Sequence, residues 1–282
     1  MSIGSGPIWL VGGGKMGSAL AGGWIARGLA PGNLTVVEPN AEAAAPWIAR
    51  GTAVCADARD LVAPATSVTV VLAVKPQTMP AVLTTLADRV PAGSLVLSIA
   101  AGVPLATFTQ AFLSGAVVVR AMPNTPAAVG RGITALVAGG GADAAACARA
   151  DELMAAVGET VWLEREADLH AVTALSGGGP AYLFLLIEAL AAAGARAGLD
   201  PALAMRLARA TVVGAGELAR VSEEHPETLR RNVTSPGGTT AEALRVLMAD
   251  DGVQALFDRA LAAAAARSVE LGGEEQDGDG RR

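Results

Sequence analysis

Three glycines near the start of the chain have the spacing of a phosphate-binding loop. Gly12, Gly14 and Gly17 form the pattern G-x-G-x-x-G within GGGKMG. In such a loop the first glycine permits a tight turn, the second lets the backbone approach a pyrophosphate, and the third lets the helix pack against the strand. The free N–H groups of the following helix then face the phosphates. The spacing predicts a dinucleotide site, and the alternative is an ordinary glycine-rich turn.

Glu38 is the second candidate residue of this site. It follows Gly17 by about 20 residues, the usual offset of the acid that binds the hydroxyls of the adenosine ribose. A carboxylate there repels a 2′-phosphate, and the nearest downstream arginine is Arg50. The position therefore favours NADH over NADPH. The alternative is an exposed charge at the end of a strand.

Three further loops are expected at the same edge of the sheet, because ligands bind beyond the carboxyl ends of parallel strands. They are Lys75-Pro76, Ala100-Ala101-Gly102 and residues 122–126. In the last of these, two prolines flank Asn124 and Thr125 and make the loop rigid. The amide and the hydroxyl could hold a substrate or the nicotinamide, and the alternative is a structural turn.

Two segments in the second half of the chain also stand out. Residues 232–240, NVTSPGGTT, precede a predicted helix, whose free N–H groups and the hydroxyls of Thr239 and Thr240 suit a small anion such as a carboxylate. Helix capping by either threonine is the alternative, and it is compatible with that role. Residues 176–180, SGGGP, interrupt an apolar helical stretch. Each glycine costs about 1 kcal/mol relative to alanine, so we expect a bend or the close approach of another chain.

The segments that must position these residues alternate between strand and helix in the first half. Buried strands are expected at 7–11, 34–38, 67–74, 95–99, 116–120 and 133–138. Helices are expected from Met16 to Gly28, at 41–50, 78–89 and 104–113, and up to about Val157. This alternation implies right-handed crossovers and a mostly parallel sheet. The predicted fold class is α/β, with an N-terminal Rossmann-type sheet.

The character of the sequence changes near residues 162–166, after which only helices are expected. The stretch 170–196 holds one charge, Glu188, between Ala171 and Ala195, and a helix that is apolar all round must be buried all round. The remaining helices, 203–223, 241–248 and 253–271, are too few to surround it, so we expect a second subunit to cover it. The predicted domains are 1–163 for the dinucleotide, 164–271 for an all-helical dimerisation and substrate domain, and 272–282 for a disordered tail.

Composition and charge exclude other classes of protein. The chain has 282 residues, 52% of them hydrophobic and 17% charged, which excludes a disordered chain. A net charge of −6 without a basic run argues against nucleic acid as a partner. The longest apolar stretch, 181–195, contains Glu188 and is short for a membrane span of about 20 residues. The first ten residues lack the cationic region of a signal peptide, so a cytoplasmic protein is expected.

The remaining reactive side chains give few candidates. Cys55 and Cys147 are far apart and have no metal-type spacing, so no metal site is expected. His170 and His225 fall in no motif, and we expect neither to be catalytic. Lys15 and Lys75 are the only lysines, which excludes any mechanism that needs a lysine after position 75.

Together these segments resemble pyrroline-5-carboxylate reductases. The resemblance extends from about Pro7 to Leu271, and its pieces are GGGKMG, AVKPQ, SIAAGV, RAMPNTP, LSGGGPAY and NVTSPGGTTAEAL. The last piece is close to the family signature and is far more specific than the glycine pattern. The family reduces L-1-pyrroline-5-carboxylate to L-proline with NAD(P)H, in the last step of proline biosynthesis. The resemblance implies a Rossmann domain, a helical domain that interlocks two subunits, and often a decamer of five such dimers.

The resemblance also implies the roles of individual residues. The expected cofactor-binding residues are Gly12, Gly14, Lys15, Met16, Gly17, Glu38, Ala73, Val74, Lys75, Pro76, Ala100 and Asn124. The expected substrate-binding residues are Ser235, Gly237, Gly238, Thr239, Thr240, Glu223 and Asn124. Thr240 matches the family threonine whose hydroxyl faces the ring nitrogen, which makes it the expected catalytic residue. The partner subunit is expected to complete the pocket.

Two positions depart from the family pattern. Gly178 replaces the second serine of the usual S-G-S-G-P-A-Y, a change that loosens the helix without touching the chemistry. The usual Asp-Asn pair in the loop after the second helix reads Asp57-Ala58, which puts one contact to the adenosine ribose in doubt.

Two other readings of the function stay open at this point. A β-hydroxyacid dehydrogenase or a related imine reductase shares the Rossmann-plus-helices plan and a similar glycine loop. The dehydrogenases use a lysine on the long helix of the second domain, where this chain has none. A non-catalytic protein that senses dinucleotides would keep the glycine loop but has no need of TSPGGTT.

Overall fold

The computed structural model describes residues 3–4, 6–63, 65–113 and 115–273. These residues divide into two compact units. The N-terminal unit extends to Gly177 and also includes the end of the chain from Ala264 onward, and the helical unit is Gly178–Ala263. The predicted boundary near residue 163 stays a prediction.

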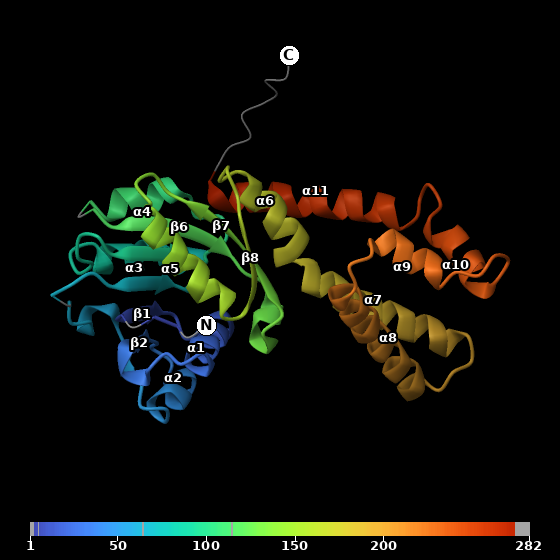
Figure 1. The fold of residues 1–282 in the computed structure, drawn as a ribbon, viewed down its shortest axis with the longest axis horizontal. Coiled ribbons are helices and arrows are strands. Elements are labelled where there is room, and N and C mark those ends of the chain that lie inside the picture. The colour runs from blue at the N-terminus through green and yellow to red at the C-terminus, as the bar shows by residue number, and fades with distance from the viewer. Residues whose placement is uncertain (1–2, 5, 64, 114, 274–282) are drawn as a thin grey trace, which may run out of the picture. The chain divides into compact units, whose positions relative to one another are not determined.

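An eight-stranded sheet forms the centre of the described part of the N-terminal unit (Figure 1). Its order is β3-β2-β1-β4-β5-β6-β7-β8, and neighbouring strands are parallel except for the antiparallel pair β6 and β7. The strands are β1 (Ile8–Val11), β2 (Leu34–Val37), β3 (Ala53–Cys55), β4 (Thr69–Leu72), β5 (Leu95–Ser98), β6 (Val117–Met122), β7 (Gly132–Ala138) and β8 (Gly158–Trp162). The predicted fold class, with its mostly parallel sheet, is confirmed.

Helices cover both faces of the sheet because side chains alternate along the strands. Ile8 of β1 contributes to the core beneath α1 (Lys15–Ala26), α2 (Ala41–Ile48) and α5 (Ala144–Ala155). Its neighbour Trp9 contributes to the opposite core, beneath α3 (Met79–Leu86) and α4 (Leu105–Ala111). The buried indole N–H of Trp24 donates to the Leu153 carbonyl at 2.8 Å and ties α1 to α5.

Three short elements were not predicted, and each lacks a continuous buried face. Strands β3 and β8 are the two edges of the sheet and consist mostly of half-buried or exposed residues. Helix α9 (Pro226–Asn232) has no buried residue and begins at Pro226, behind the His225 cap. Hydrophobic periodicity predicts a helix or strand only where one of its faces is buried, so it could not predict these three elements.

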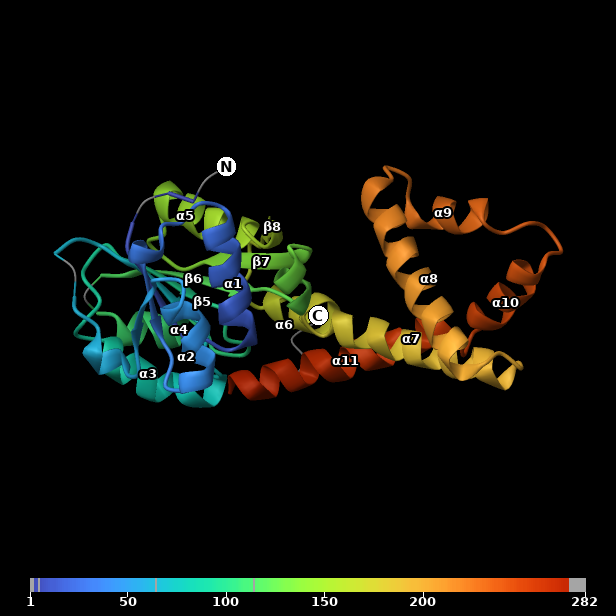
Figure 2. The ribbon, with the colours of Figure 1, turned by 90° about the horizontal axis from the view of Figure 1, so that it is seen from below.

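The helical unit consists of α7 (Gly179–Arg196), α8 (Pro201–Val221), α9, α10 (Thr239–Leu247) and the first part of α11 (Val253–Gly272). Helices α7 and α8 pack against each other (Figure 2). Asp200 caps α8 by accepting the N–H of Leu203 at 3.0 Å, with Pro201 in the first turn. Tyr182 and Phe257 make an edge contact between α7 and α11, with ring centroids 6.3 Å apart.

The predicted long apolar helix is interrupted and largely exposed in the single chain. Residues 168–196 comprise α6 (Asp168–Val172), a π-helical turn η5 (Thr173–Gly177) and α7. Leu183, Phe184 and Leu185 are 52%, 61% and 63% exposed, so this chain alone does not bury them. By length and composition, Asp168–Arg196 could cross a membrane, and one such helix is weak evidence for a span. A covering second subunit accounts for the same apolar surface.

The C-terminal end of the chain differs slightly from the prediction. Gly272, which was expected to begin the disordered tail, is the last residue of α11. Residues 274–282, which make up most of the predicted tail, lie outside the described residues.

Candidate active site

The glycine loop has the geometry of a pyrophosphate cradle. Gly12 has a φ of +106°, and a Cβ there would lie 2.6 Å from the Ala73 carbonyl oxygen. A Cβ on Gly17 would lie 2.1 Å from the Gly12 carbonyl oxygen, so α1 can approach the loop only with glycine at this position. Gly14 is different, because a Cβ on it would meet no described atom within 4 Å. Gly14 is also the N-cap of α1 and provides no side-chain cap, which leaves the helix start open to an anion.

Glu38 closes the other side of this loop. It directly follows β2, and its Oε2 accepts the N–H of Gly13 at 2.8 Å. Its Oε1 accepts the N–H of Asn40 at 2.9 Å. These two bonds fix the carboxylate beside the glycine loop, and each oxygen keeps a further lone pair for a ligand hydroxyl.

Two neighbouring hollows extend along the carboxyl edge of the sheet. The first, of about 560 Å³, lies where the strand order reverses between β1 and β4, the position at which open α/β sheets bind ligands. The second, of about 300 Å³, shares Ala73, Val74 and Lys75 with the first and reaches the loops after β5 and β6. All the predicted cofactor-binding residues except Lys15 and Gly17 line one or both hollows. We call the two hollows together the cofactor cleft.

Asn124 lies in the cleft, but internal hydrogen bonds hold its amide. Its Oδ1 accepts the N–H of Ile133 at 3.0 Å, and its Nδ2 donates to the Ser176 carbonyl at 3.2 Å. The residue is 9% exposed and is followed by the short helix η4 (Thr125–Val129). The amide therefore fixes the loop after β6, and one N–H of Nδ2 remains for a ligand. The predicted contact of Asn124 with the substrate or nicotinamide stays a prediction.

The π-helical turn η5 is a part of the cleft whose role sequence reasoning left open. Gly177 lines the cleft, and a Cβ on it would lie 2.6 Å from Cε of Met122. The neighbouring Ser176 carbonyl accepts from Asn124. The glycines of SGGGP predicted a bend or the close approach of another chain, whereas the close approach at Gly177 is to Met122 of the same chain. π-Bulges of this kind occur often at functional sites.

A buried ion pair fixes strand β6, which leads into the loop that carries Asn124. Arg120 of β6 is 4% exposed, and its Nη1 lies 2.5 Å from Oε1 of Glu166. The same Glu166 oxygen accepts the N–H of Leu105 at 2.6 Å, at the start of α4. Glu166 thereby joins β6, α4 and the segment before α6, although no sequence motif marked it.

In the helical unit, the TSPGGTT segment forms a turn that ends at the N-terminus of α10. Gly238 is the N-cap, so the expectation that Thr239 or Thr240 might cap this helix is wrong. The N–H of Gly238 donates to the Ser235 carbonyl at 3.1 Å, and Gly237 has a φ of +68°. Ser235, Thr239 and Thr240 are exposed. The helix start thus presents backbone N–H groups with two hydroxyls beside them.

The acids that precede this segment lie just after α8. Glu223 is exposed. Its neighbour Glu224 accepts from Nδ2 of Asn232 at 3.2 Å and so ties the end of α8 to the beginning of the NVTSPGGTT segment. Glu223 was a predicted site residue, but Glu224 was not. Two adjacent glutamates look alike in a sequence, and only the structure shows which of them bonds to Asn232.

Asp57 adds a second carboxylate to the end of the cleft that Glu38 lines. Its hydrogen bonds with Arg59 lower the pKa of the Asp57 carboxyl from 3.8 to about 2, so it is ionised at neutral pH. Arg59 itself is 73% exposed. Among the described residues, no group of three or more histidine, cysteine, aspartate or glutamate side chains could hold a metal ion.

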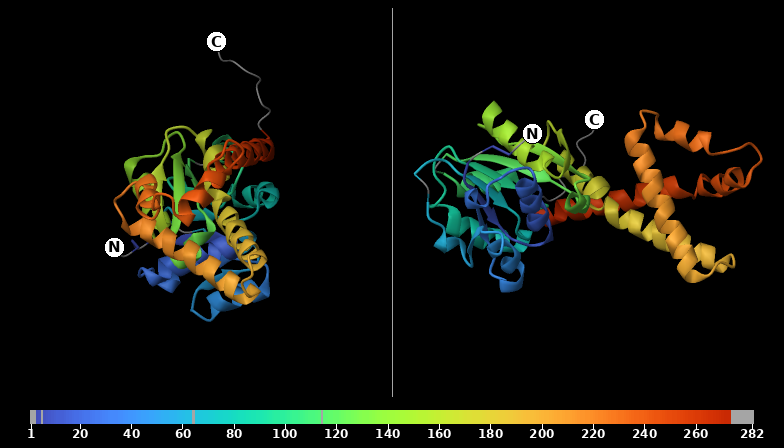
Figure 3. Two further views of the ribbon diagram at one scale, coloured as in Figure 1. Left: turned by 90° about the vertical axis from the view of Figure 1, so that its right-hand side faces the viewer. Right: turned by 60° about the horizontal axis from the view of Figure 1, so that its bottom comes forward.

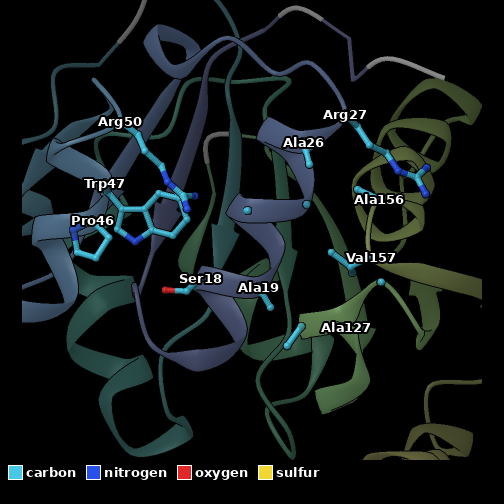
Figure 4. A pocket seen from close by; sticks show the side chains of 14 residues that line it. Ser18, Ala19, Ala26, Arg27, Pro46, Trp47, Arg50, Ala127, Ala156 and Val157 are labelled. Carbon is cyan, nitrogen blue, oxygen red and sulfur yellow. The ribbon is translucent and has the colours of Figure 1, made fainter.

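A further hollow, of about 520 Å³, lies elsewhere on α1 (Figure 4). Trp47 of α2 and Arg50, two residues after the helix ends, line one side, with the guanidinium 5.1 Å from the indole centroid. Ala127 and Val157 line the other side. None of the predicted site residues lines this hollow. Among the described residues that line it, Arg27 and Arg50 are the only ionisable ones, and both are exposed. These lining residues therefore offer no general acid or base for catalysis.

Comparison with known proteins matches two parts of the chain to two different family models. Residues 166–271 match the family model for pyrroline-5-carboxylate reductase dimerisation, and residues 7–102 match that for coenzyme F420-dependent NADP oxidoreductases. The chain is 43% identical over 264 residues to the pyrroline-5-carboxylate reductase of Pseudomonas aeruginosa, covering 94% of this chain and 96% of that one.

Two solved structures are also similar. The pyrroline-5-carboxylate reductase of Coxiella burnetii is 36% identical with a TM-score of 0.88, and the match covers 95% of this chain and 99% of that one. The pyrroline carboxylate reductase of Plasmodium falciparum, solved with NADP bound, is 28% identical with a TM-score of 0.79, covering 94% and 98%.

A glycine loop at the switch point of a Rossmann-type sheet, joined to a helical dimerisation domain, defines a nicotinamide-dependent oxidoreductase. The identity of 43% over nearly the whole length of a known enzyme narrows that class to one family. The chain belongs to the pyrroline-5-carboxylate reductase family.

Proposed function

We propose that the protein reduces the C=N bond of L-1-pyrroline-5-carboxylate to give L-proline. The observation that carries this proposal is the start of α10, where Gly238 leaves the helix N-terminus without a side-chain cap beside the hydroxyls of Thr239 and Thr240. A carboxylate is the kind of ligand that such a helix start stabilises. Neither a dehydrogenase that uses a lysine nor a dinucleotide sensor has a need for this segment.

The residues of the cofactor cleft fit a nicotinamide dinucleotide. The space that a side chain on Gly14 would fill is open for a pyrophosphate, and the uncapped N-terminus of α1 faces it. When bound, the reduced nicotinamide supplies a hydride to the imine carbon. The loops that carry Lys75, Ala100 and Asn124 line the other end of the cleft and orient the ring there.

The chain's own residues bind, orient and assist the substrate in this proposal. The backbone of Ser235, Gly237 and Gly238 and the hydroxyl of Thr239 hold the carboxylate, with Glu223 nearby in sequence. The Thr240 hydroxyl bonds to the ring nitrogen, where a proton completes the amine. A protonated imine is already electrophilic, so orientation supplies most of the catalysis and no strong general acid is needed.

Replacing Thr240 with alanine tests the role of its hydroxyl. We expect kcat/KM for pyrroline-5-carboxylate to fall by about 10- to 100-fold, because one hydrogen bond to the reacting ring is lost. Thr240→Ser keeps the hydroxyl and should retain most of the activity. A Thr240→Ala enzyme with unchanged kcat and KM would remove this residue from the mechanism.

An acid of the cleft supports a preference for NADH. Glu38 and Asp57 line its adenosine end, and Lys75 is the one cation among the described lining residues. Because Asp57 is already paired with Arg59, it is the Glu38 carboxylate that disfavours the 2′-phosphate that distinguishes NADPH. We therefore propose NADH as the preferred cofactor.

Removing the charge of Glu38 tests that preference. In Glu38→Gln we expect the ratio of kcat/KM for NADPH to that for NADH to rise about tenfold, because one repulsive charge is lost. The matched control is Glu42→Gln, which removes an exposed acid of α2 that lines neither hollow. An unchanged ratio in Glu38→Gln would contradict the assignment.

The assembly is proposed to be a homodimer, with five dimers forming a decamer. The exposed apolar side chains of α7 and the match of residues 166–271 to a dimerisation model support the dimer. The partner subunit is expected to complete the substrate pocket, and a cytoplasmic location stays a prediction.

The proposed activity is tested by mixing purified protein, NADH or NADPH, and pyrroline-5-carboxylate, and following the loss of the near-ultraviolet absorbance of the reduced cofactor. Absence of turnover with both cofactors would contradict it.

A further inference from the structure

The last turns of α11 belong to the N-terminal unit, although the helix begins in the other unit. Ser268 is 5% exposed, and its Oγ lies 2.9 Å from Nδ1 of His170 on α6, which is 9% exposed. This buried hydrogen bond joins the two helices, and Figure 3 shows the red end of α11 beside α6. His170 therefore serves in the attachment of α11.

One turn further on, the backbone of α11 closely approaches the backbone of the loop after β5. A Cβ on Gly102 would lie 3.2 Å from the Gly272 nitrogen and 3.3 Å from the Leu271 carbonyl oxygen. A Cβ on Gly272 would lie 2.7 Å from the Gly102 carbonyl oxygen. Gly102 also has a φ of +77°, a conformation that other residues rarely adopt. Both sides of the contact thus require glycine.

The two elements that α11 touches both lead to the lining of the same hollow. The loop that ends at Gly102 contributes Ile99, Ala100 and Ala101 to the nicotinamide end of the cofactor cleft. Helix α6 continues into η5, which contributes Gly177 to the same hollow and accepts the Asn124 amide through Ser176. A shift of α11 would therefore move two parts of the lining that are far apart in sequence.

We propose that the C-terminal turns of α11 position the nicotinamide end of the cleft, with Gly102 and Gly272 as positioning residues. The proposal rests on the cleft's binding a nicotinamide cofactor, as set out above. The contact does not reach the cofactor itself. It sets the place of the Ala100–Ala101 backbone, while the Ser268–His170 bond sets the place of η5.

The test compares alanine substitutions in matched pairs. Gly102→Ala and Gly93→Ala both place alanine at a similar positive φ, +77° and +72°, but a side chain on Gly93 meets no described atom within 4 Å. Gly272→Ala likewise pairs with Gly273→Ala, whose Cβ is also free of described neighbours. Each variant is made in the full-length protein, and its Tm and its Kd for NADH and NADPH are measured.

We expect Gly102→Ala and Gly272→Ala to raise the Kd for the preferred cofactor about tenfold, at a temperature where both are folded. The control variants should bind like the parent protein even where their Tm falls. Unchanged cofactor Kd in folded Gly272→Ala would overturn the proposal.

If the glycine variants fail to fold, Ser268→Ala supplies the test, because it removes one hydrogen bond and adds no atom. A weaker rise in Kd, of about threefold, is expected there, and a parent-like value would overturn the proposal equally. Cofactor Kd is measured without pyrroline-5-carboxylate. A failure of the proposed reaction therefore appears separately, as a parent protein that binds cofactor and does not turn over.

Discussion

Gly14→Val is expected to abolish cofactor binding while leaving the fold intact. A side chain at this position meets no described atom within 4 Å, so the protein itself can accommodate it. The same space is the one that a pyrophosphate must enter to reach the N-terminus of α1. We expect the Kd for NADH to rise by about 100-fold or more, since phosphate contacts anchor the whole dinucleotide.

Two other glycines of α1 sharpen this test. Gly22→Val places a side chain in equally open space away from the cofactor cleft and should leave the Kd for NADH unchanged. Gly17→Ala should instead damage the fold, because its Cβ would lie 2.1 Å from the Gly12 carbonyl oxygen. Calorimetric titration with NADH, together with circular dichroism, separates the three outcomes. Parent-like binding by Gly14→Val would show that the cradle is elsewhere.

Glu166→Ala is expected to destabilise the N-terminal unit by about 3 kcal/mol. The substitution leaves the Arg120 guanidinium, whose side chain is 5% exposed, without its carboxylate. It also removes the acceptor of the Leu105 N–H. Breaking a buried pair from one side costs about 3–5 kcal/mol, and because the Glu166 side chain is 29% exposed we expect the lower end, about 3 kcal/mol.

Urea unfolding of the full-length protein measures this loss. Glu164→Ala is the matched control, since Glu164 is exposed two residues earlier and should change the free energy of unfolding by less than about 0.5 kcal/mol. The double variant Arg120→Met with Glu166→Ala should recover part of the loss, because it leaves no unpaired charge. A Glu166→Ala protein as stable as the Glu164→Ala control would contradict the role of the ion pair.

The sequence predicted what depends on local signals. The buried strands β1, β4 and β5 are apolar runs, and the glycine loop has a fixed spacing, so both could be placed from neighbouring residues alone. The edge strands β3 and β8 could not, because β3 has only three residues and the apolar run of β8 is interrupted by Glu159 and Thr160.

The residue types of the site could be predicted from the sequence, but the hydrogen bonds and ion pairs that hold these residues could not. Most of the predicted cofactor-binding residues line one cleft. The partner of Asn124 is a carbonyl 52 residues later, in a π-helical turn. The carboxylate that pairs with Arg120 is likewise 46 residues away. Such pairings follow from the packing of distant elements, which leaves no trace in the spacing of a motif.

The most direct test of the central claim follows the hydride itself. Purified protein is incubated with pyrroline-5-carboxylate and NADH that carries deuterium at both C4 positions, and the product is examined by mass spectrometry. We predict L-proline that contains one deuterium atom, on the ring carbon that was the imine carbon. Proline without deuterium, or no proline with either NADH or NADPH, would contradict the account.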